Sequence, residues 1–246
     1  MGSVRRLPLV TFLVVSIWTV GGLVVDRQVG HTGQLALGVF TAGVLAALLV
    51  LQPTKVRMQT LAVVGIATLG EIVGSLVWGL YGYRLENLPA FVPPAHGLVY
   101  LGGVALAGLA AGRERLLVGL AFVAVLAWGI AGVTVPPRED LGGLLGAVLL
   151  AVFLLRGRAP ATYAGVFAVV AALELYGTAL GTWRWAEVAP GTSITQGNPP
   201  SGIASGYVFF DIAALALAPV ALALTRRARR SRSVPGAPLP EPARSG

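Results

Sequence analysis

Eight long apolar segments follow one another along almost the whole chain and are separated by short polar stretches. Most of them approach the roughly 20 residues that a helix needs to cross a bilayer. A spanning backbone must satisfy its own hydrogen bonds, so segments of this length are restricted to helices. We therefore predict an all-α, polytopic membrane protein with eight transmembrane helices, over residues 8–25, 34–52, 58–82, 95–112, 116–134, 141–155, 159–182 and 203–225.

Composition favours a membrane protein over a soluble one. Of the 246 residues, 56% are hydrophobic and 11% are charged, whereas soluble domains carry roughly 25% charged residues. The net charge of +8 would suit a nucleic-acid-binding protein, but the cations flank apolar segments and no nucleic-acid reader motif accompanies them. We therefore expect no nucleic-acid partner. The absence of cysteine excludes disulfides and thiolate metal sites.

The positions of the cations predict the orientation of the chain. Pairs or clusters of Lys and Arg alternate with single Arg residues from loop to loop. Cytoplasmic loops are enriched in these residues, so both termini should be cytoplasmic and the loops 83–94 and 183–202 should lie outside the cell membrane. The predicted cytoplasmic cations are Arg5, Arg6, Lys55, Arg57, Arg113, Arg115, Arg156, Arg158, Arg226, Arg227, Arg229, Arg230 and Arg232, and the predicted outer ones are Arg27, Arg84, Arg138 and Arg184.

Residues 71–100 and 174–207 share a series of landmarks in the same order. Each stretch begins with Glu in an apolar run, followed three and four residues later by Gly and a small hydroxyl residue. A Gly-x-aromatic-x-aromatic motif, a Pro-Pro pair and a new apolar run come next. The landmarks are Glu71, Gly74, Ser75, Gly79, Tyr81, Tyr83, Pro93 and Pro94 in the first copy, and Glu174, Gly177, Thr178, Gly181, Trp183, Trp185, Pro199 and Pro200 in the second.

These shared landmarks indicate an internal duplication. Each copy would contain four spans, an even number, so the two halves would run parallel and be related by an axis along the membrane normal. We predict a first four-helix repeat over residues 1–112 and a second over residues 113–230. Residues 231–246, rich in Pro, Ser and Arg, should form a disordered cytoplasmic tail.

The repeated acids Glu71 and Glu174 are the first candidates for catalysis. A charge at the bilayer centre costs about 2.5–3.5 kcal/mol on insertion scales, so intramembrane acids usually face the bundle interior and serve a function. Residues three, four and seven positions later share the face of each Glu, which places Trp78 beside Glu71. The small residues on this face predict close approach of a neighbouring helix. Asp211, one turn after Tyr207, is the third candidate acid. Alternatively, each Glu is protonated and only joins helices by hydrogen bonds.

Aromatic side chains follow both acids. They could belong to the aromatic belt at the membrane interface. However, aromatic faces also stabilise cations, and a carboxyl group kept neutral by burial can donate a proton. Together they could protonate an alkene and shelter the resulting carbocation. The candidate substrate-binding residues are Trp78, Tyr81, Tyr83, His96, Tyr100, Trp183, Trp185, Asn198 and Tyr207.

The sequence predicts no cofactor and no metal. His31 and His96 are the two histidines, and without a binding pattern they are weak evidence for haem. His96 lies at the start of the fourth apolar segment. A lone His in such a place is more often a satisfied polar group than a ligand.

The motifs Glu-x-x-Gly-Ser, Gly-x-Tyr-x-Tyr and Val-Pro resemble those of the carotenoid-biosynthesis membrane proteins that include the carotenoid hydratases. The resemblance implies an all-helical membrane enzyme that adds water across a terminal double bond of a long polyene. Integral-membrane lycopene cyclases are a related comparison, implying ring closure through a protonated alkene. His96 and the Asn198-Pro199-Pro200 run fall outside the pattern. The motifs are carried by Glu71, Gly74, Ser75, Gly79, Tyr81, Tyr83, Val92 and Pro93, with a looser copy at Glu174, Gly177, Thr178, Gly181, Trp183 and Trp185.

We therefore expect an enzyme that acts on an isoprenoid or similar lipid entering from the bilayer. Glu71 or Glu174 would be the general acid, and the other, or Asp211, would hold water or a counter-charge. The expected partners are the lipid substrate and the membrane, and the oligomeric state is left open. Two alternatives remain: a proton- or cation-coupled transporter whose acids bind the cation, and a non-catalytic scaffold whose acids join helices.

Overall fold

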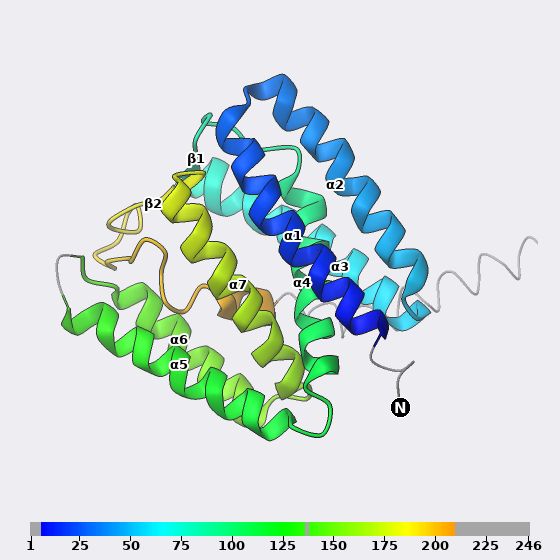
Figure 1. Cartoon of the computed structure of the whole chain (residues 1–246). Coiled ribbons are helices and arrows are strands. Elements are labelled where there is room, and N and C mark those ends of the chain that lie inside the picture. Colours follow the sequence, from blue (N-terminus) through cyan, green and yellow to red (C-terminus); the bar gives the residue numbers. More distant parts are fainter. Residues whose placement is uncertain (1–5, 136–137, 210–246) are drawn as a thin grey trace, which may run out of the picture.

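The computed structural model describes residues 6–135 and 138–209, which form an all-helical bundle with one short two-stranded sheet (Figure 1). Asp211, most of the predicted eighth span and the predicted tail lie outside these residues. The elements are α1 (Arg6–Gln28), α2 (His31–Leu51), α3 (Thr54–Glu71), the π-helix η1 (Ile72–Trp78), β1 (Tyr81–Tyr83), α4 (Val92–Leu109), α5 (Glu114–Thr134), α6 (Leu141–Arg156), α7 (Pro160–Leu180) and β2 (Trp183–Trp185).

Six helices in the described part of the chain are long and apolar enough to cross a membrane. They are α1, α2, α3 continued by η1, α4, α5 and α7, whereas α6 is apolar but shorter. Large apolar side chains cover the outer surface of the bundle; Ile17, Val39 and Val77 are each at least 70% exposed. Such a surface is unfavourable in water and suits contact with lipid chains. The chain is therefore a helical membrane protein.

Helices α4 and α7 form the centre of the bundle. Helix α4 packs against α1, α2, α3 and α7, and α7 also contacts α5 and α6. Figure 1 shows the α5–α6 pair on one side of α7 and the α1–α2 pair on the other. At the crossing of α4 and α7, a Cβ atom added to Gly165 would lie 2.2 Å from the carbonyl oxygen of Gly103. The two backbones are therefore in direct contact, as small residues permit between membrane helices.

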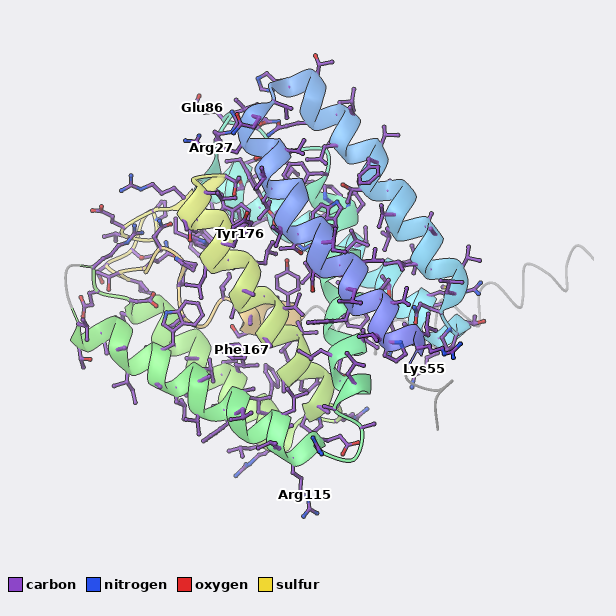
Figure 2. The ribbon with its side chains drawn as sticks, in the orientation of Figure 1. Arg27, Lys55, Glu86, Arg115, Phe167 and Tyr176 are labelled. Carbon is purple, nitrogen blue, oxygen red and sulfur yellow. The ribbon has the colours of Figure 1, made fainter. Side chains whose placement is uncertain are left out.

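Charged side chains mark the two ends of the bundle. Figure 2 shows Lys55 and Arg115 at one end and Arg27 and Glu86 at the other. This arrangement follows from the chain path, because α1 ends at Arg27 and Gln28 whereas α3 and α5 begin next to Lys55 and Arg115. Strands β1 and β2 lie at the end that carries Arg27.

Buried polar contacts hold the loops at this end in place. The Arg84 guanidinium donates to the carbonyl oxygens of Asp26 and Val29, which ties β1 to the end of α1. The Asp140 carboxylate caps α6 by accepting from the Gly143 N–H at 3.0 Å. It also accepts from the N–H groups of Gly197 and Ser201, at 2.6 and 2.7 Å. A buried carboxylate with three backbone donors is well satisfied, so this loop has a fixed position.

The contact between Gly165 and Gly103 predicts that Gly165→Ala destabilises the protein. Alanine is the better helix former, but its methyl group would displace a backbone, and overpacking of this kind costs about 1–3 kcal/mol. Gly119→Ala on α5 is the matched control, because nothing lies within 4 Å of a Cβ atom there. Thermal unfolding in detergent should give a lower midpoint for Gly165→Ala and an equal or higher one for Gly119→Ala. Equal midpoints for the two variants would contradict the close crossing.

Candidate functional site

The two aromatic motifs pair with each other in a small antiparallel sheet. Tyr81 lies opposite Trp185, and Tyr83 lies opposite Trp183. Alternate residues of a strand point to opposite faces, so these four rings share one face. Their centroids are 4.4 Å apart in the first pair and 6.2 Å in the second. Arg184, on the other face, is about three-quarters exposed.

Glu71 accepts hydrogen bonds from both tyrosines of β1. Its Oε2 atom lies 2.8 Å from the Tyr81 hydroxyl and 2.7 Å from the Tyr83 hydroxyl. Its other oxygen, Oε1, lies 3.1 Å from Nε2 of His96, at ion-pair distance. Glu71 therefore has two phenol donors and one imidazole neighbour, all of them buried or half-buried.

Glu174 has the corresponding contacts with the tryptophans of β2. Its Oε2 atom accepts from the indole N–H of Trp183 at 2.9 Å and of Trp185 at 3.2 Å. The Glu174 side chain is buried, and no described Lys, Arg or His forms an ion pair with it. Each acid is thus held by the two aromatic residues of the strand that follows its own helix. The two acids differ in their donors: phenols and an imidazole for one, indoles for the other.

A glycine three residues after each acid makes room for an aromatic ring. A Cβ atom on Gly74 would lie 3.2 Å from the Tyr81 ring, and one on Gly177 would lie 2.0 Å from the Trp183 ring. The sequence predicted that these small residues admit a neighbouring helix. In the structure they admit the aromatic side chains that fold back from β1 and β2. Both helices end in a glycine with positive φ, Gly79 at 77° and Gly181 at 70°, which reverses the chain toward its strand.

Both acids and all four rings line one cavity of about 360 Å³ between α1, α3, α4, α6 and α7. None of the described residues around it is Lys or Arg. The charged or titratable groups are the two carboxyls, the Tyr81, Tyr83 and Tyr207 phenols, and His96. The other polar side chains at this cavity are Trp18, Trp183, Trp185, Gln196 and Ser205, and the remaining lining is apolar or glycine.

The phenols of Tyr81 and Tyr83 stay protonated in this environment. Burial, followed by the negative charge of Glu71, raises the pKa of both phenols well above the usual value of 10.0. The phenols are therefore permanent hydrogen-bond donors, and the Oε2 atom of Glu71 is fixed as their acceptor.

His96 is buried on the wall of the cavity, with 5% of its surface exposed. Its ring packs against Tyr207, with the centroids 5.4 Å apart. The Nε2 atom lies close to Glu71, but the angles at this contact are not those of a hydrogen bond. The Nδ1 atom has no hydrogen-bond partner among the described residues. His96 therefore brings a polar edge to the cavity that the described part of the protein leaves unsatisfied. His31, in contrast, lies exposed at the start of α2.

Three predicted binding residues lie outside the cavity lining. Trp78 was expected on the face of Glu71, but the i→i+5 bonding of η1 widens the turn and changes the phase of the helix. Its ring is 47% exposed, and its N–H donates to the Pro190 carbonyl. Tyr100 is buried away from the cavity, and the Asn198 side chain accepts from the Trp185 backbone N–H at 2.9 Å. Asn198 thus contacts β2 itself.

Sequence reasoning did not foresee the two strands or the role of Asp140. The alternation of aromatic and other residues in Tyr81-Gly82-Tyr83 and Trp183-Arg184-Trp185 has the period of a strand, and this signal was available. The contacts of Asp140 with Gly197 and Ser201 carry no comparable signal, because these partners lie 57 and 61 residues away.

Comparison of the chain with protein-family models, with curated proteins and with solved structures gave no match. Any functional assignment must therefore come from the chemistry of the cavity.

The buried phenols predict a distinct alkaline titration. Because folding raises their pKa, the stability that these protons contribute is complete below about pH 10 and is lost as pH rises further. At about pH 11, the folded protein and a folded Tyr81→Phe/Tyr83→Phe variant should show the same near-ultraviolet phenolate absorbance. After denaturation, the original protein should exceed the variant by two phenolates. An excess of two phenolates in the folded state would contradict the burial of these donors.

Proposed function

We propose that this protein is an integral membrane enzyme that protonates an alkene of an isoprenoid or polyene lipid, leading to hydration or cyclisation. One observation carries the proposal: the buried Glu174 carboxyl, the Glu71 carboxyl, whose side chain is only 12% exposed, and four aromatic rings share a cavity whose described lining has no Lys or Arg. Acid chemistry needs the carboxyls, and a cationic intermediate needs the rings. The lipid-facing surface of the bundle fits an apolar substrate.

Glu174 is the general acid in this proposal. A buried carboxylate without a counter-charge is costly, so the neutral carboxyl suits this place better. Both indoles donate to Oε2, which leaves Oε1 to carry and deliver the proton. Glu71 is the opposite case, because two phenols and the nearby His96 stabilise its negative charge.

The reaction is balanced in protons. The proton on Glu174 bonds to the less substituted carbon of a trisubstituted alkene, and the π electrons of the alkene form this C–H bond. The other carbon becomes a tertiary cation. In hydration, water adds to the cation and its proton passes to Glu71. In cyclisation, a second alkene of the same chain attacks instead, and the ring loses a proton to Glu71. Transfer of that proton through His96 and water to Glu174 would restore both acids.

The size and charge of the cavity limit the substrate. A volume of about 360 Å³ lies at the lower end of the range for small-ligand sites, so the cavity holds one end of a long polyene rather than the whole chain. Phosphate groups are usually bound by Arg or Lys, which the described lining lacks. The reacting end is therefore neutral and not a diphosphate.

The proposed architecture is eight spans in two parallel four-helix repeats, with both termini cytoplasmic. The matching surroundings of Glu71 and Glu174 support the duplication: each acid accepts from two aromatic donors, 10 and 12 residues on in one copy and 9 and 11 in the other. The antiparallel pairing of β1 with β2 also suits two halves related by a two-fold axis. In this arrangement the cavity lies beneath the outer loops.

A cation-coupled transporter is the second candidate, because two acids and aromatic rings in one cavity also suit a cation in transit. Uptake of a labelled organic cation into proteoliposomes, driven by a pH gradient and lost in Glu174→Gln, would favour the transporter. Product formation without a gradient would favour the enzyme.

Glu174→Gln and Glu71→Gln test the catalytic roles. With lycopene, an acyclic polyene with trisubstituted terminal alkenes, we expect each variant to lose at least about 100-fold in product formation, as removal of an acid or base typically causes. Glu187→Gln is the control, because the Glu187 side chain is 75% exposed outside the cavity. Products should be separated by chromatography after incubation with purified protein. Unchanged product formation in both cavity variants would remove the acids from the reaction.

The orientation can be tested with single cysteines, because the chain contains none. Arg184→Cys, on the exposed face of β2, should react with a membrane-impermeant maleimide in intact cells. Lys55→Cys, at the opposite end of the bundle (Figure 2), should react only after the cells are permeabilised. The reverse pattern would invert the proposed topology.

A further inference from the structure

The cavity carries negative charge that an organic cation would neutralise. Two carboxyl groups reach it, and the imidazole of His96 is the one nitrogen base that accompanies them among the described lining residues. With Glu71 ionised, no Lys or Arg in the described lining offsets its negative charge, even when Glu174 keeps its proton. The Glu71 carboxylate would repel an anion that entered the cavity and attract a cation.

The four rings form an aromatic wall of the cavity. Tyr81 and Trp185 are tilted at 44° to each other, and Tyr81 and Tyr83 stand edge to face at 79°. The rings are in contact with one another and are not stacked in parallel, and all four line the cavity. Trp and Tyr rings are the usual binding surfaces for quaternary and tertiary ammonium groups. The ring faces are electron-rich, and an ammonium group of this kind has no tightly held water shell to lose on binding.

His96 is a separate indication that something binds here. Its side chain is more than nine-tenths buried on the cavity wall, and Nδ1 has no hydrogen-bond partner among the described residues. Leaving such an atom unsatisfied costs about 1–3 kcal/mol, a cost that a bound molecule or water would relieve. The N–H of a protonated tertiary amine is a suitable donor to this nitrogen.

We infer that the cavity is a binding site for apolar organic cations with a compact ammonium head. The head lies against the rings of Tyr81, Tyr83, Trp183 and Trp185 that line the cavity, and its charge is balanced by Glu71. This inference concerns binding and holds whether or not the site turns over an alkene. It is also consistent with the proposed enzyme, because an ammonium ion carries the positive charge of a tertiary carbocation with similar alkyl substituents and would act as an inhibitor that mimics the charge of the intermediate.

The test compares three probes of similar size on the purified protein. Benzyltrimethylammonium is the cation, neopentylbenzene is its neutral carbon analogue, and benzenesulfonate is the anion. The detergent should be a maltoside, because phosphocholine detergents themselves carry a quaternary ammonium group. Tryptophan fluorescence and calorimetric titration should show that the cation binds at least about 10-fold more tightly than the neutral analogue, and that the anion does not bind.

Matched variants locate the bound cation. Glu71→Gln keeps the shape of the side chain and removes its negative charge, so the cation should bind about 10-fold more weakly while the neutral analogue is unaffected. Glu187→Gln, outside the cavity, should leave both affinities unchanged. Equal binding of the cation and the neutral analogue by the original protein would overturn the inference without any variant. Failure of the catalytic assay above would not affect it, because binding is measured without turnover.

Discussion

The site depends on hydrogen bonds between two intramembrane carboxyl groups and the aromatic residues of a two-stranded sheet. A carboxyl group inside a bilayer needs donors, and here each acid obtains two from a strand that follows its own helix. Pairing of β1 with β2 then brings the two acids to the same cavity. The sheet thus supplies donors to the acids, contributes to the lining of the cavity and joins the two segments of the chain.

The two acids share a geometry but not a chemistry. Tyr81 and Tyr83 donate through hydroxyl groups, and His96 beside Glu71 can take up or release a proton. Indole N–H groups cannot exchange protons in this way, so Trp183 and Trp185 hold Glu174 without joining a relay. An arrangement in which one acid keeps its proton and the other keeps its charge is the usual requirement for paired acid–base catalysis. The difference between the surroundings of the two acids is therefore what the proposed reaction needs, since two identical acids would compete for the same role.

The sequence predicted the helices well because their signal is local. The apolar segment over 58–82 corresponds to Thr54–Trp78, and that over 159–182 corresponds to Pro160–Leu180. It also predicted that the repeated acids and aromatic residues belong to one site, because both recur in the same order. The π-helix was missed, since nothing in Ile72–Trp78 distinguishes its bonding from that of an α-helix, and Trp78 was consequently placed on the wrong face. The partners of Asp140 and Arg84 could not be predicted, because contacts between distant residues leave no periodic pattern in one sequence.

These distant contacts explain how a cavity can persist at the end of the bundle that carries the loops. Loops usually move more than the elements they connect, and a mobile β1–β2 sheet would not hold two carboxyl groups in register. Arg84 fixes the end of β1 to the turn after α1, and Arg138 donates to the carbonyl of Trp185 at 2.9 Å, which fixes β2. Asp140 then secures the segment after β2 through Gly197 and Ser201. Arg84 and Arg138 thus have a structural task that the sequence did not predict: they preorganise the aromatic face, so that a bound cation or cationic intermediate would meet rings that are already in place.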